Sequence, residues 1–538
     1  MAMRTGAPGQ SFRLTTAEWI GLLVAILIMF VLLQASYISF KPVPGNDPRW
    51  PLGWWGWFDQ GNYLRAAKAF LDLNFAPSEH YYPPLYPLVG AAFVGLSPAH
   101  PFYFVDLAAT FGFFLLFVFT TRRYVGFWAA LVVGATFMVA FHMVRLQWVI
   151  PWTSTLSALL VAAGLYLFDR FDRARGDGRW GIAAATSNAF VFGLLCGLQL
   201  PLRPGDILLM APIALGYGGL VVIDMVNGPA FVRRRAIWSA VAGVVGLIPG
   251  AVLMFGFNLI VFGDLLGGYF EGHVDKGFYF ADLPEKVFSL VVASHPIYLE
   301  RGADWLTELP LNALCIGFVP AAALFARPLV FRIAAVAALL QMALYFSFSD
   351  ALPTGTFRYW NIHYFKWMLP WMAVFAVSFV YQSAAGIRDD RGRARTGLAT
   401  GVLLTLLLFS VNVEPVPRST VTVEEGDQAR LVLHNPQGRP IEYIDIDGKP
   451  GDWGQVYFDN HATIRLDGGD PLQNYGEYRM LPRGGDGIRL VFIRPTSAFE
   501  ISVDFGESLT PTADLDGTSV RPYDVNFGLD LPFASHWR

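Results

Sequence analysis

Long apolar segments recur through most of this chain and restrict its fold more than any other feature. A helix that crosses a bilayer needs about 20 consecutive apolar residues, because the hydrocarbon core is about 30 Å thick. Of the 538 residues, 54% are hydrophobic and 15% are charged, well below the charge of a soluble domain. We therefore predict a polytopic α-helical membrane protein. About eleven transmembrane helices are expected, at residues 17–39, 102–121, 126–144, 153–169, 181–200, 206–226, 236–262, 308–326, 330–348, 367–386 and 396–413.

The distribution of basic residues predicts the orientation of these helices. Cytoplasmic loops carry an excess of Lys and Arg. If the N-terminus is cytoplasmic, every basic cluster falls on the cytoplasmic side and the C-terminus lies outside. The scarcity of lysine beside arginine hints at a GC-rich bacterial genome and no more. The expected location is the bacterial inner membrane. The basic clusters are Arg4 with Arg13, Arg122-Arg123, residues 170–179, Arg233 to Arg235, Arg327 with Arg332, and residues 388–395.

This orientation divides the chain into a cytoplasmic tail (1–14), a transmembrane domain (15–413) and an outer C-terminal domain (414–538). The first outer loop spans residues 40–101. Within it, the apolar stretch 83–97 is short and opens with two prolines, so we expect a helix lying in the outer interface.

A carboxylate opens the helical part of this first outer loop. Asp59 precedes a run in which Tyr63 and later apolar residues recur at helical spacing, while Arg65 and Lys68 share another face. The pattern predicts an amphipathic helix on the membrane surface. Asp59 could serve only as the N-cap of that helix, and the tryptophans before it could be an interfacial belt.

Other polar residues also fall on the outer side. They could be plain loop residues or, for the basic ones, anchors that snorkel to the interface. Binding of a lipid phosphate is the alternative, because Arg recognises phosphate in a planar, bidentate way and Lys supplies a point charge. A metal site in the loop around His273 is conceivable, but that loop has no specific ligand pattern. These residues are Tyr82, Arg145, Arg203, Tyr269, His273, Arg358, Tyr359, His363 and Lys366.

Composition changes sharply near Glu414, where a Pro-containing stretch reads as a linker. Acidic residues then outnumber basic ones, as expected of an exposed domain. Alternating apolar and polar residues predict an antiparallel β-sandwich. The expected strands are TVTVEE, ARLVLH, IEYIDID, QVYFDN, ATIRLD, IRLVFIRP and FEISVDF.

The ordered outer-side motifs resemble the GT-C class of integral-membrane glycosyltransferases. The similarity covers roughly residues 15–412 and is greatest to the aminoarabinose transferase and protein O-mannosyltransferase group, which uses polyprenyl-phosphate sugars. Its motifs are Asp59 with Tyr63, PPLYPL at 83–88, Leu-Arg-Pro at 202–204, FGDLLGGY at 262–269, and Arg358-Tyr359 before a Pro-containing span.

The resemblance implies that a sugar moves from a polyprenyl-phosphate donor to a hydroxyl of a cell-envelope glycan, a lipid or a protein, with inversion. Asp59 would be the general base, and basic residues would stabilise the leaving phosphate. Because relatives often have a second carboxylate where this chain has Gln60, no metal or other cofactor is assigned. The implied phosphate ligands are Arg358, Lys366, His363 and Arg203, and the implied cavity residues are Tyr63, Tyr82, Arg145, Tyr269, His273 and Tyr359.

Two other functions compete with this one. A transporter or flippase of a lipid-linked sugar should carry ionisable residues near the centres of its spans, where this sequence has almost none. A non-enzymatic envelope assembly protein would leave the surroundings of Asp59 and Arg358 without a purpose. Cys196 and Cys315 both lie in apolar segments and predict no disulfide, and nothing predicts a nucleic-acid partner.

Overall fold

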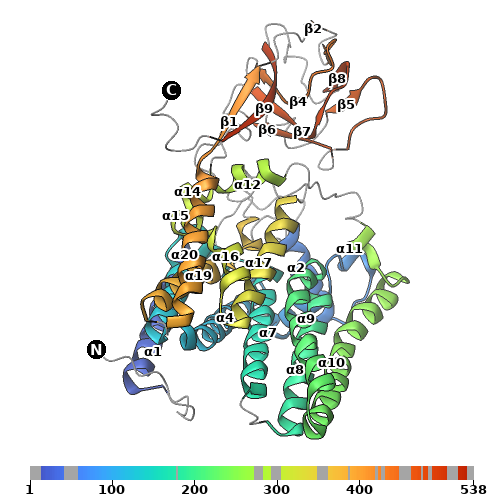
Figure 1. The fold of residues 1–538 in the computed structure, drawn as a ribbon. Coiled ribbons are helices and arrows are strands. Elements are labelled where there is room, and N and C mark those ends of the chain that lie inside the picture. The colour runs from blue at the N-terminus through green and yellow to red at the C-terminus, as the bar shows by residue number, and fades with distance from the viewer. Residues whose placement is uncertain are drawn as a thin grey trace. The chain divides into compact units, whose positions relative to one another are not determined.

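The chain folds into a set of long helices followed by two β-sheets, as seen in a computed structural model (Figure 1). It divides into two compact units. The first comprises Met1–Gly267, Ala321–Ala338 and His363–Leu398, and the second Gly268–Pro320, Leu339–Ile362 and Ala399–Arg538. The structure describes residues 14–40, 58–176, 180–271, 283–292, 304–347, 361–385, 388–417, 422–425, 430–447, 462–473, 477–482, 487–505 and 519–529.

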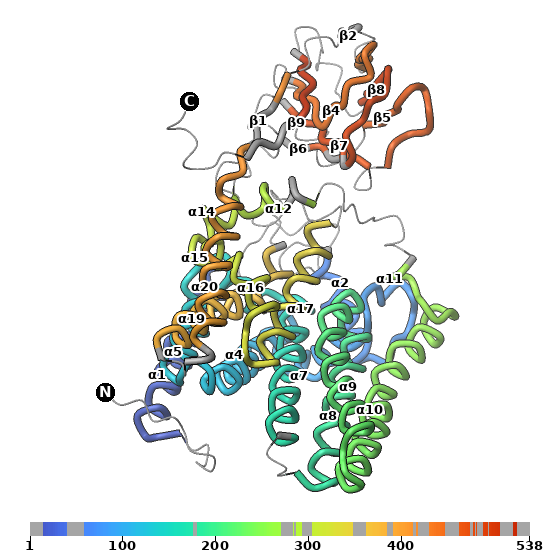
Figure 2. Tube along the Cα trace, in the orientation of Figure 1, coloured from blue at the N-terminus to red at the C-terminus, as the bar shows by residue number. Residues whose placement is uncertain are grey.

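The helices alternate between long apolar elements and short connecting turns. In the first unit α8 packs along α7, α9 and α10, and α4 packs on α5 and α7, as Figures 1 and 2 allow the reader to follow. The helices are α1 (Thr16–Phe40), α2 (Phe58–Leu71), η1 (Pro77–Glu79), α3 (Leu85–Val94), α4 (Phe102–Val125), α5 (Phe127–Val139), α6 (His142–Gln147), α7 (Thr153–Gly176), α8 (Ile182–Leu202), η2 (Pro204–Asp206), α9 (Ile207–Asn227), α10 (Ala230–Phe262), α11 (Gly267–Glu271), α12 (Leu283–Val291), α14 (Trp305–Glu308), α15 (Pro310–Cys315), α16 (Phe318–Phe325), α17 (Leu329–Ser347), η3 (Asn361–Tyr364), α19 (Leu369–Ala385) and α20 (Arg388–Phe409).

Seven helices of the described chain are long and apolar enough to cross a membrane. Much of their apolar surface is not covered by protein. In the 18-residue apolar stretch that qualifies each helix as a span, only 17% is buried in α1 and 33% in α10. Exposed helix faces that are this apolar are expected to contact lipid rather than water. The protein is therefore an integral membrane protein, as the sequence predicts. The seven are α1, α4, α7, α8, α9 together with η2, α10 and α17.

The other four predicted spans differ from the expectation of eleven. The expected span at 126–144 is a 13-residue α5, about 20 Å long at 1.5 Å per residue, followed by the separate α6. The expected span at 308–326 is divided into α14, α15 and α16. Helix α19 has 17 residues, and α20 begins inside the basic stretch expected to precede its span. The apolar segments in the sequence continue past the residues at which these helices end, so the expected spans extend past the ends of the observed helices.

Helices α8 and α10 approach each other unusually closely through glycine. A Cβ atom added at Gly193 would lie 2.0 Å from the Gly243 carbonyl oxygen, and one at Gly250 would lie 2.0 Å from the Gly197 carbonyl oxygen. Small residues at such positions let helix backbones touch, which is the usual basis of close helix pairing in membranes. These glycines are therefore required by packing, since any side chain would push the two helices apart.

The β region forms two antiparallel sheets around one apolar core, so the predicted sandwich is present. One sheet has the order β1-β9-β4-β7-β6 and the other β2-β3-β8-β5. Strand β1 starts at Val411, so the expected linker near Glu414 lies within a strand paired with β9. The strands are β1 (Val411–Pro417), β2 (Thr422–Glu425), β3 (Arg430–His434), β4 (Ile441–Asp447), β5 (Thr463–Leu466), β6 (Tyr478–Pro482), β7 (Gly487–Thr496), β8 (Glu500–Asp504) and β9 (Ser519–Leu529).

Six of the seven expected strands correspond to β2, β3, β4, β5, β7 and β8, while QVYFDN lies outside the described residues. The sequence pattern missed β1, β6 and β9. Each of these contains proline, which disfavours a strand in the interior of a sheet. Strands β1 and β6 are the edges of their sheet, where proline is tolerated.

Candidate functional site

Asp59 lies in the first turn of α2, where its carboxylate accepts a hydrogen bond from the hydroxyl of Tyr82. A negative charge is favoured there by the helix dipole. Along α2, Gln60, Tyr63 and most of the following residues are buried against protein. Asp59 is therefore held at the edge of a packed helix.

Three tyrosines connect Asp59 to a second, buried carboxylate. The ring of Tyr63 lies 4.7 Å from that of Tyr82 and 5.2 Å from that of Tyr86, between centroids. The Tyr86 hydroxyl donates to Asp106 Oδ2 over 2.9 Å. Tyr86 and Asp106 are both fully buried, near the N-terminal ends of α3 and α4 respectively. Ring contacts and hydrogen bonds thus form one continuous path from Asp59 to Asp106.

Other polar contacts around Asp59 are made to the segment that connects α6 to α7. Gln60 Nε2, next to Asp59 in sequence, donates to the Pro151 carbonyl oxygen over 3.3 Å. The Thr110 hydroxyl lies 3.1 Å from the Trp148 carbonyl oxygen and 2.7 Å from the Asp106 carbonyl oxygen, and it shares its one proton between them, which ties the same connection to α4. Since α2, α4 and the segment before α19 all bond to residues 147–155, this connection positions each of them.

Arg203 is held at the junction of α8 and η2. Its Nε lies 3.1 Å from Asp206 Oδ1, and its Nη1 donates to Thr153 Oγ1 over 3.2 Å. The guanidinium carbon sits 4.8 Å from the centre of the Tyr364 ring. The other Asp206 oxygen accepts a hydrogen bond from Ser157 over 2.6 Å. With 13% of its side chain exposed, Arg203 is a fixed cation near the edge of the buried region.

His363 is stacked flat on Trp152, with ring centroids 4.0 Å apart and planes 6° from parallel. Its Nδ1 lies 3.1 Å from Ser154 Oγ. Burial lowers the pKa of His363 well below its ordinary value, and the charges of Arg203 and Lys366 act in the same direction. His363 is therefore a neutral imidazole near pH 7.

Lys366 is 1% exposed. Its ammonium donates to the Gln147 carbonyl oxygen over 2.7 Å and to Thr155 Oγ1 over 2.6 Å. Burial lowers the pKa of Lys366, and the nearby Asp106 opposes this shift. These two hydrogen bonds from Nζ hold the segment before α19 in place. We call this connected set the Asp59 cluster: Asp59, Gln60, Tyr63, Tyr82, Tyr86, Asp106, Gln147, Pro151, Trp152, Thr153, Ser154, Thr155, Ser157, Arg203, Asp206, His363 and Lys366.

The other predicted site residues are placed differently. Arg145 donates to Ser36 Oγ over 2.6 Å and to the Val139 carbonyl oxygen over 2.9 Å, so it fastens α6 to α1 and to the end of α5. Tyr269 belongs to the second unit, where its ring contacts Phe270 edge to face. The predicted residues His273, Arg358 and Tyr359 lie outside the described residues.

Several residues of the cluster were not among the predicted site residues. They include Tyr86, Asp106, Trp152, Ser157 and Asp206. Two signals could have found some of them. Asp106 is an isolated carboxylate near the start of an apolar segment, and such residues are costly unless they have a role. A dense run of hydroxyl residues at 153–157 opens another span.

A second polar cluster occupies the opposite ends of the same helices. Along α9, Asp206 and Asp224 are about 27 Å apart at 1.5 Å per helical residue. Asp224 Oδ1 pairs with Arg175 at 2.5 Å and Oδ2 with Arg235 at 3.0 Å. We call this set the Asp224 cluster; it consists of Tyr124, Asp169, Arg173, Arg175, Asp224 and Arg235.

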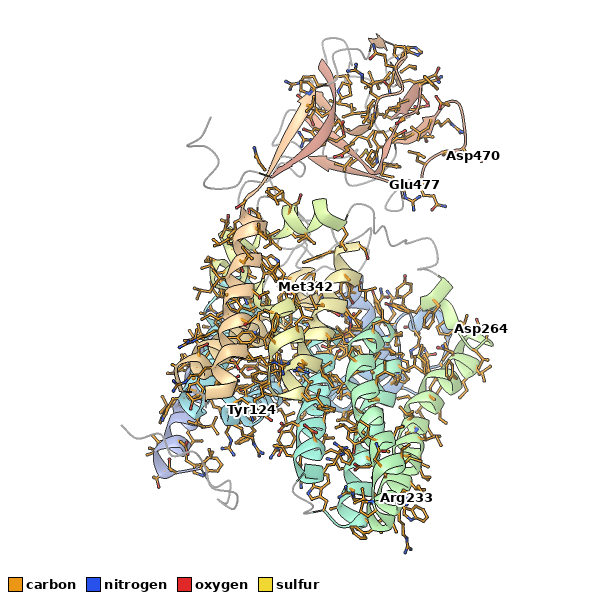
Figure 3. The ribbon with its side chains drawn as sticks, viewed as in Figure 1. Tyr124, Arg233, Asp264, Met342, Asp470 and Glu477 are labelled. Carbon is orange, nitrogen blue, oxygen red and sulfur yellow. The ribbon has the colours of Figure 1, made fainter. Side chains whose placement is uncertain are left out.

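Figure 3 labels one member of the Asp224 cluster and two residues near the ends of α10. It labels Tyr124, whose hydroxyl donates to Asp169, and Arg233 near the start of α10. Asp264, also labelled, follows the other end of α10. Asp169 also pairs with Arg173 at 2.9 Å, four residues along the same helix. The cluster therefore ties together the ends of α4, α7, α9 and α10.

Within the described chain, no group of three or more His, Cys, Asp or Glu side chains is arranged to hold a metal ion. Gln60 Oε1, Asp106 Oδ1 and Gln147 Nε2 are buried without a hydrogen-bond partner among the described residues. Buried polar atoms are nearly always satisfied in folded proteins. The Asp59 cluster therefore contains polar groups to which water or a substrate could bond.

Comparisons with known proteins find similarity among solved structures. No protein-family model matches the chain, and no curated protein matches it. The crystal structure of ArnT from Cupriavidus metallidurans bound to undecaprenyl phosphate aligns with a TM-score of 0.44 and 14% sequence identity. The alignment covers 73% of this chain and 65% of ArnT, so this chain spans just under two thirds of that structure's length.

Proposed function

We propose that this chain is a glycosyltransferase that moves a sugar from a polyprenyl-phosphate donor to a hydroxyl acceptor on the outer face of the membrane. One observation carries the proposal. Segments far apart in sequence contribute a carboxylate, Asp59, and two cationic residues, Arg203 and Lys366, to a single connected cluster. Sugar transfer needs a base for the attacking hydroxyl and positive charge for the leaving phosphate.

Asp59 is the general base in this proposal. The Asp59 carboxylate accepts a hydrogen bond from the Tyr82 hydroxyl, which favours its ionised form. An ionised carboxylate can take up the proton of an attacking hydroxyl. Attack from the face opposite the phosphate inverts the anomeric carbon. Tyr63 and Tyr82 border this base, and with Tyr269, His273 and Tyr359 they are the proposed contacts to substrate.

Arg203 and Arg358 are the proposed ligands of the donor phosphate. Arg203 fits this role because its planar fork is fixed by Asp206 and Thr153 at a partly exposed position. Lys366 acts from inside the protein by its charge, since its ammonium is bonded to Gln147 and Thr155. The neutral His363 positions Trp152 and Ser154 and adds no charge.

Polyprenyl donors enter from the bilayer, which agrees with the apolar outer surfaces of the spans. The acceptor is a glycan, a lipid or a protein of the cell envelope, and the β-sandwich either contacts it or stabilises the enzyme. A transporter is less well supported. In the described spans, ionisable side chains such as Asp106, Asp224 and Arg332 lie toward helix ends.

The test is release of polyprenyl phosphate by the purified protein in detergent micelles. The donors are polyprenyl-phosphate-linked mannose, glucose, galactose and arabinose, with a cell-envelope extract as acceptor. Asp59→Asn should lower kcat by about 10²–10⁴-fold, the usual contribution of general acid–base catalysis. The matched control is Asp72→Asn, which removes an exposed charge just past the end of α2. Turnover that survives in Asp59→Asn would exclude Asp59 as the base.

A further inference from the structure

A second carboxylate, fully buried and without a part in the proposed chemistry, is linked to Asp59 through three aromatic rings. Asp106 accepts the hydroxyl of Tyr86 at 2.9 Å, and the Tyr86 ring meets Tyr63 nearly perpendicularly, at 82°. Tyr63 in turn packs on Tyr82, which donates to Asp59. Every member of this path belongs to the first unit.

The far end of this path is rigid. The Tyr86 ring is stacked on Phe102 with centroids 4.5 Å apart and planes 16° from parallel. Phe102 lies so close to Gly90 that a Cβ added there would be 2.3 Å from the Phe102 ring. With its ring fixed on one face and its hydroxyl bonded to Asp106, Tyr86 has little freedom to move.

Asp106 is itself held by charge. Lys366 is close enough for its positive charge to act on Asp106, and Lys366 is fixed by its bonds to Gln147 and Thr155. A buried carboxylate survives in a protein only when it is paired or hydrogen-bonded. Tyr86 is therefore bonded to a buried aspartate that lies within range of the Lys366 charge, and the cost of burying this aspartate argues for a purpose beyond filling space.

We infer that Asp106 is a positioning residue, which sets the orientation of the Asp59 carboxylate through Tyr86, Tyr63 and Tyr82. The inference rests on the proposed function for its catalytic consequence. An oriented carboxylate matters because a small misplacement of a catalytic group lowers the rate far more than it lowers substrate binding. The consequence should therefore appear in kcat rather than in KM.

The matched pair Tyr86→Phe and Tyr124→Phe tests this inference in the full chain. Each variant removes one tyrosine hydroxyl bonded to a buried aspartate and keeps the ring. Tyr86→Phe should lower kcat with the polyprenyl-phosphate sugars about five- to tenfold and leave the donor KM within twofold. Tyr124→Phe should leave both within twofold. Equal kcat in the two variants would overturn the inference.

A rescue separates hydrogen bonding from bulk packing. Asp106→Asn keeps a carbonyl oxygen that can accept the Tyr86 hydroxyl, whereas Asp106→Leu does not. We expect Asp106→Asn to retain kcat within threefold of wild type, and Asp106→Leu to lose at least as much as Tyr86→Phe. If Asn and Leu reduce kcat equally at equal thermal stability, the path through Tyr86 does not position Asp59.

Hydrogen–deuterium exchange of α2 gives a readout that needs no turnover. Without donor, Tyr86→Phe should speed the exchange of amides at 58–64 at least twofold, and Tyr124→Phe should not change it. Faster exchange in a protein that never releases polyprenyl phosphate would support the positioning path and reject the proposed function. Unchanged exchange together with normal turnover in Tyr86→Phe would reject the path and keep the function.

Discussion

The Asp59 and Asp224 clusters lie at opposite ends of the same helices and use the same kinds of residue. Each contains a tyrosine that is hydrogen-bonded to one buried aspartate and an arginine that is paired with a second buried aspartate. In the Asp224 cluster, all four carboxylate oxygens of Asp169 and Asp224 have a partner. In the Asp59 cluster, Asp106 Oδ1 has none among the described residues.

On this difference we propose a structural role for the Asp224 cluster and a chemical role for the Asp59 cluster. The Asp224 cluster pairs each acid with arginines from helix ends, which satisfies the charges and ties the helices together. The Asp59 cluster collects groups from connections as well as helices. Among the described residues it leaves three buried polar atoms without partners, one of them a carboxylate oxygen, whereas the Asp224 cluster leaves only Arg235 Nε. Leaving such atoms unsatisfied costs about 1–3 kcal/mol each. A cost of that size is expected where a site must later bind water or substrate.

The largest expected effect comes from breaking an ion pair of the Asp224 cluster. Arg235→Met removes a buried partner of Asp224 and should lower the free energy of unfolding by about 3 kcal/mol. The matched control is Arg233→Met, because Arg233 is exposed on the same turn of α10 and should contribute less than about 0.5 kcal/mol. Unfolding titrations in mixed micelles measure both. Turnover of the folded Arg235→Met fraction should stay normal, and a selective loss of kcat would contradict the structural role of this cluster.

The next effect tests the helix pair that lies between the clusters. Gly193→Ala places a Cβ 2.0 Å from the Gly243 carbonyl oxygen, so α8 and α10 must separate. We expect a loss of about 1–3 kcal/mol, as for overpacked cores. Gly218→Ala in α9 meets nothing within 4 Å and is the control. Gly-to-Ala changes inside helices otherwise stabilise by about 0.5–1 kcal/mol. Thermal unfolding of both variants therefore should shift in opposite directions, and a shared upward shift would refute the close packing.

The sequence predicts the membrane class and the long spans well, because apolar length alone determines both. It does not predict where apolar segments divide into shorter helices, as at α5 and at α15 with α16. Nothing in a hydropathy pattern distinguishes a 13-residue helix from a span when apolar residues continue on both sides. The β-sandwich follows from alternation in most strands, while the proline-containing β1, β6 and β9 need their pairing partners to be recognised.

The candidate site is predicted only in part. Asp59 stands out at the start of an amphipathic helix in the first outer loop, and Arg203, His363 and Lys366 stand out as polar residues at expected span ends. The structure brings these four into one connected set. Sequence alone cannot reveal how they are connected. The link from Gln60 to Pro151 joins residues 91 positions apart, and the one from Lys366 to Gln147 joins residues 219 apart. Arg145 shows the converse, since a basic residue on the expected outer side is engaged in fastening helices.

A smaller effect is expected from Arg203. An Arg-to-Lys substitution should change the donor KM in the Asp59 cluster but not in the Asp224 cluster. Arg203→Lys keeps the positive charge but loses the planar fork that contacts Asp206 and Thr153. The donor KM should rise about tenfold, equivalent to about 1.4 kcal/mol. Arg173→Lys, made at the Asp169 ion pair of the other cluster, is the control and should leave KM unchanged. A similar KM for the two variants would remove Arg203 from the phosphate site.

The smallest effect concerns pH and again distinguishes the clusters, because only the Asp59 cluster contains a histidine. Burial, with Arg203 and Lys366, lowers the folded-state pKa of His363 below its unfolded value near 6.5. Below that pH this histidine binds a proton in the unfolded chain but not in the folded chain, so the free energy of unfolding falls as pH falls. The loss should be about 1 kcal/mol at pH 5.5, given about 1.4 kcal/mol per pH unit.

His363→Phe should remove this acid-side loss, since phenylalanine can keep the stack on Trp152 and does not titrate. The measurement is the difference in unfolding free energy between pH 7.5 and pH 5.5, compared for wild type, His363→Phe and His142→Phe. His142 is exposed, so its substitution should change that difference much less. If His363→Phe keeps the full acid-side loss, another group must take up the proton. The neutral His363 would then lose its thermodynamic support.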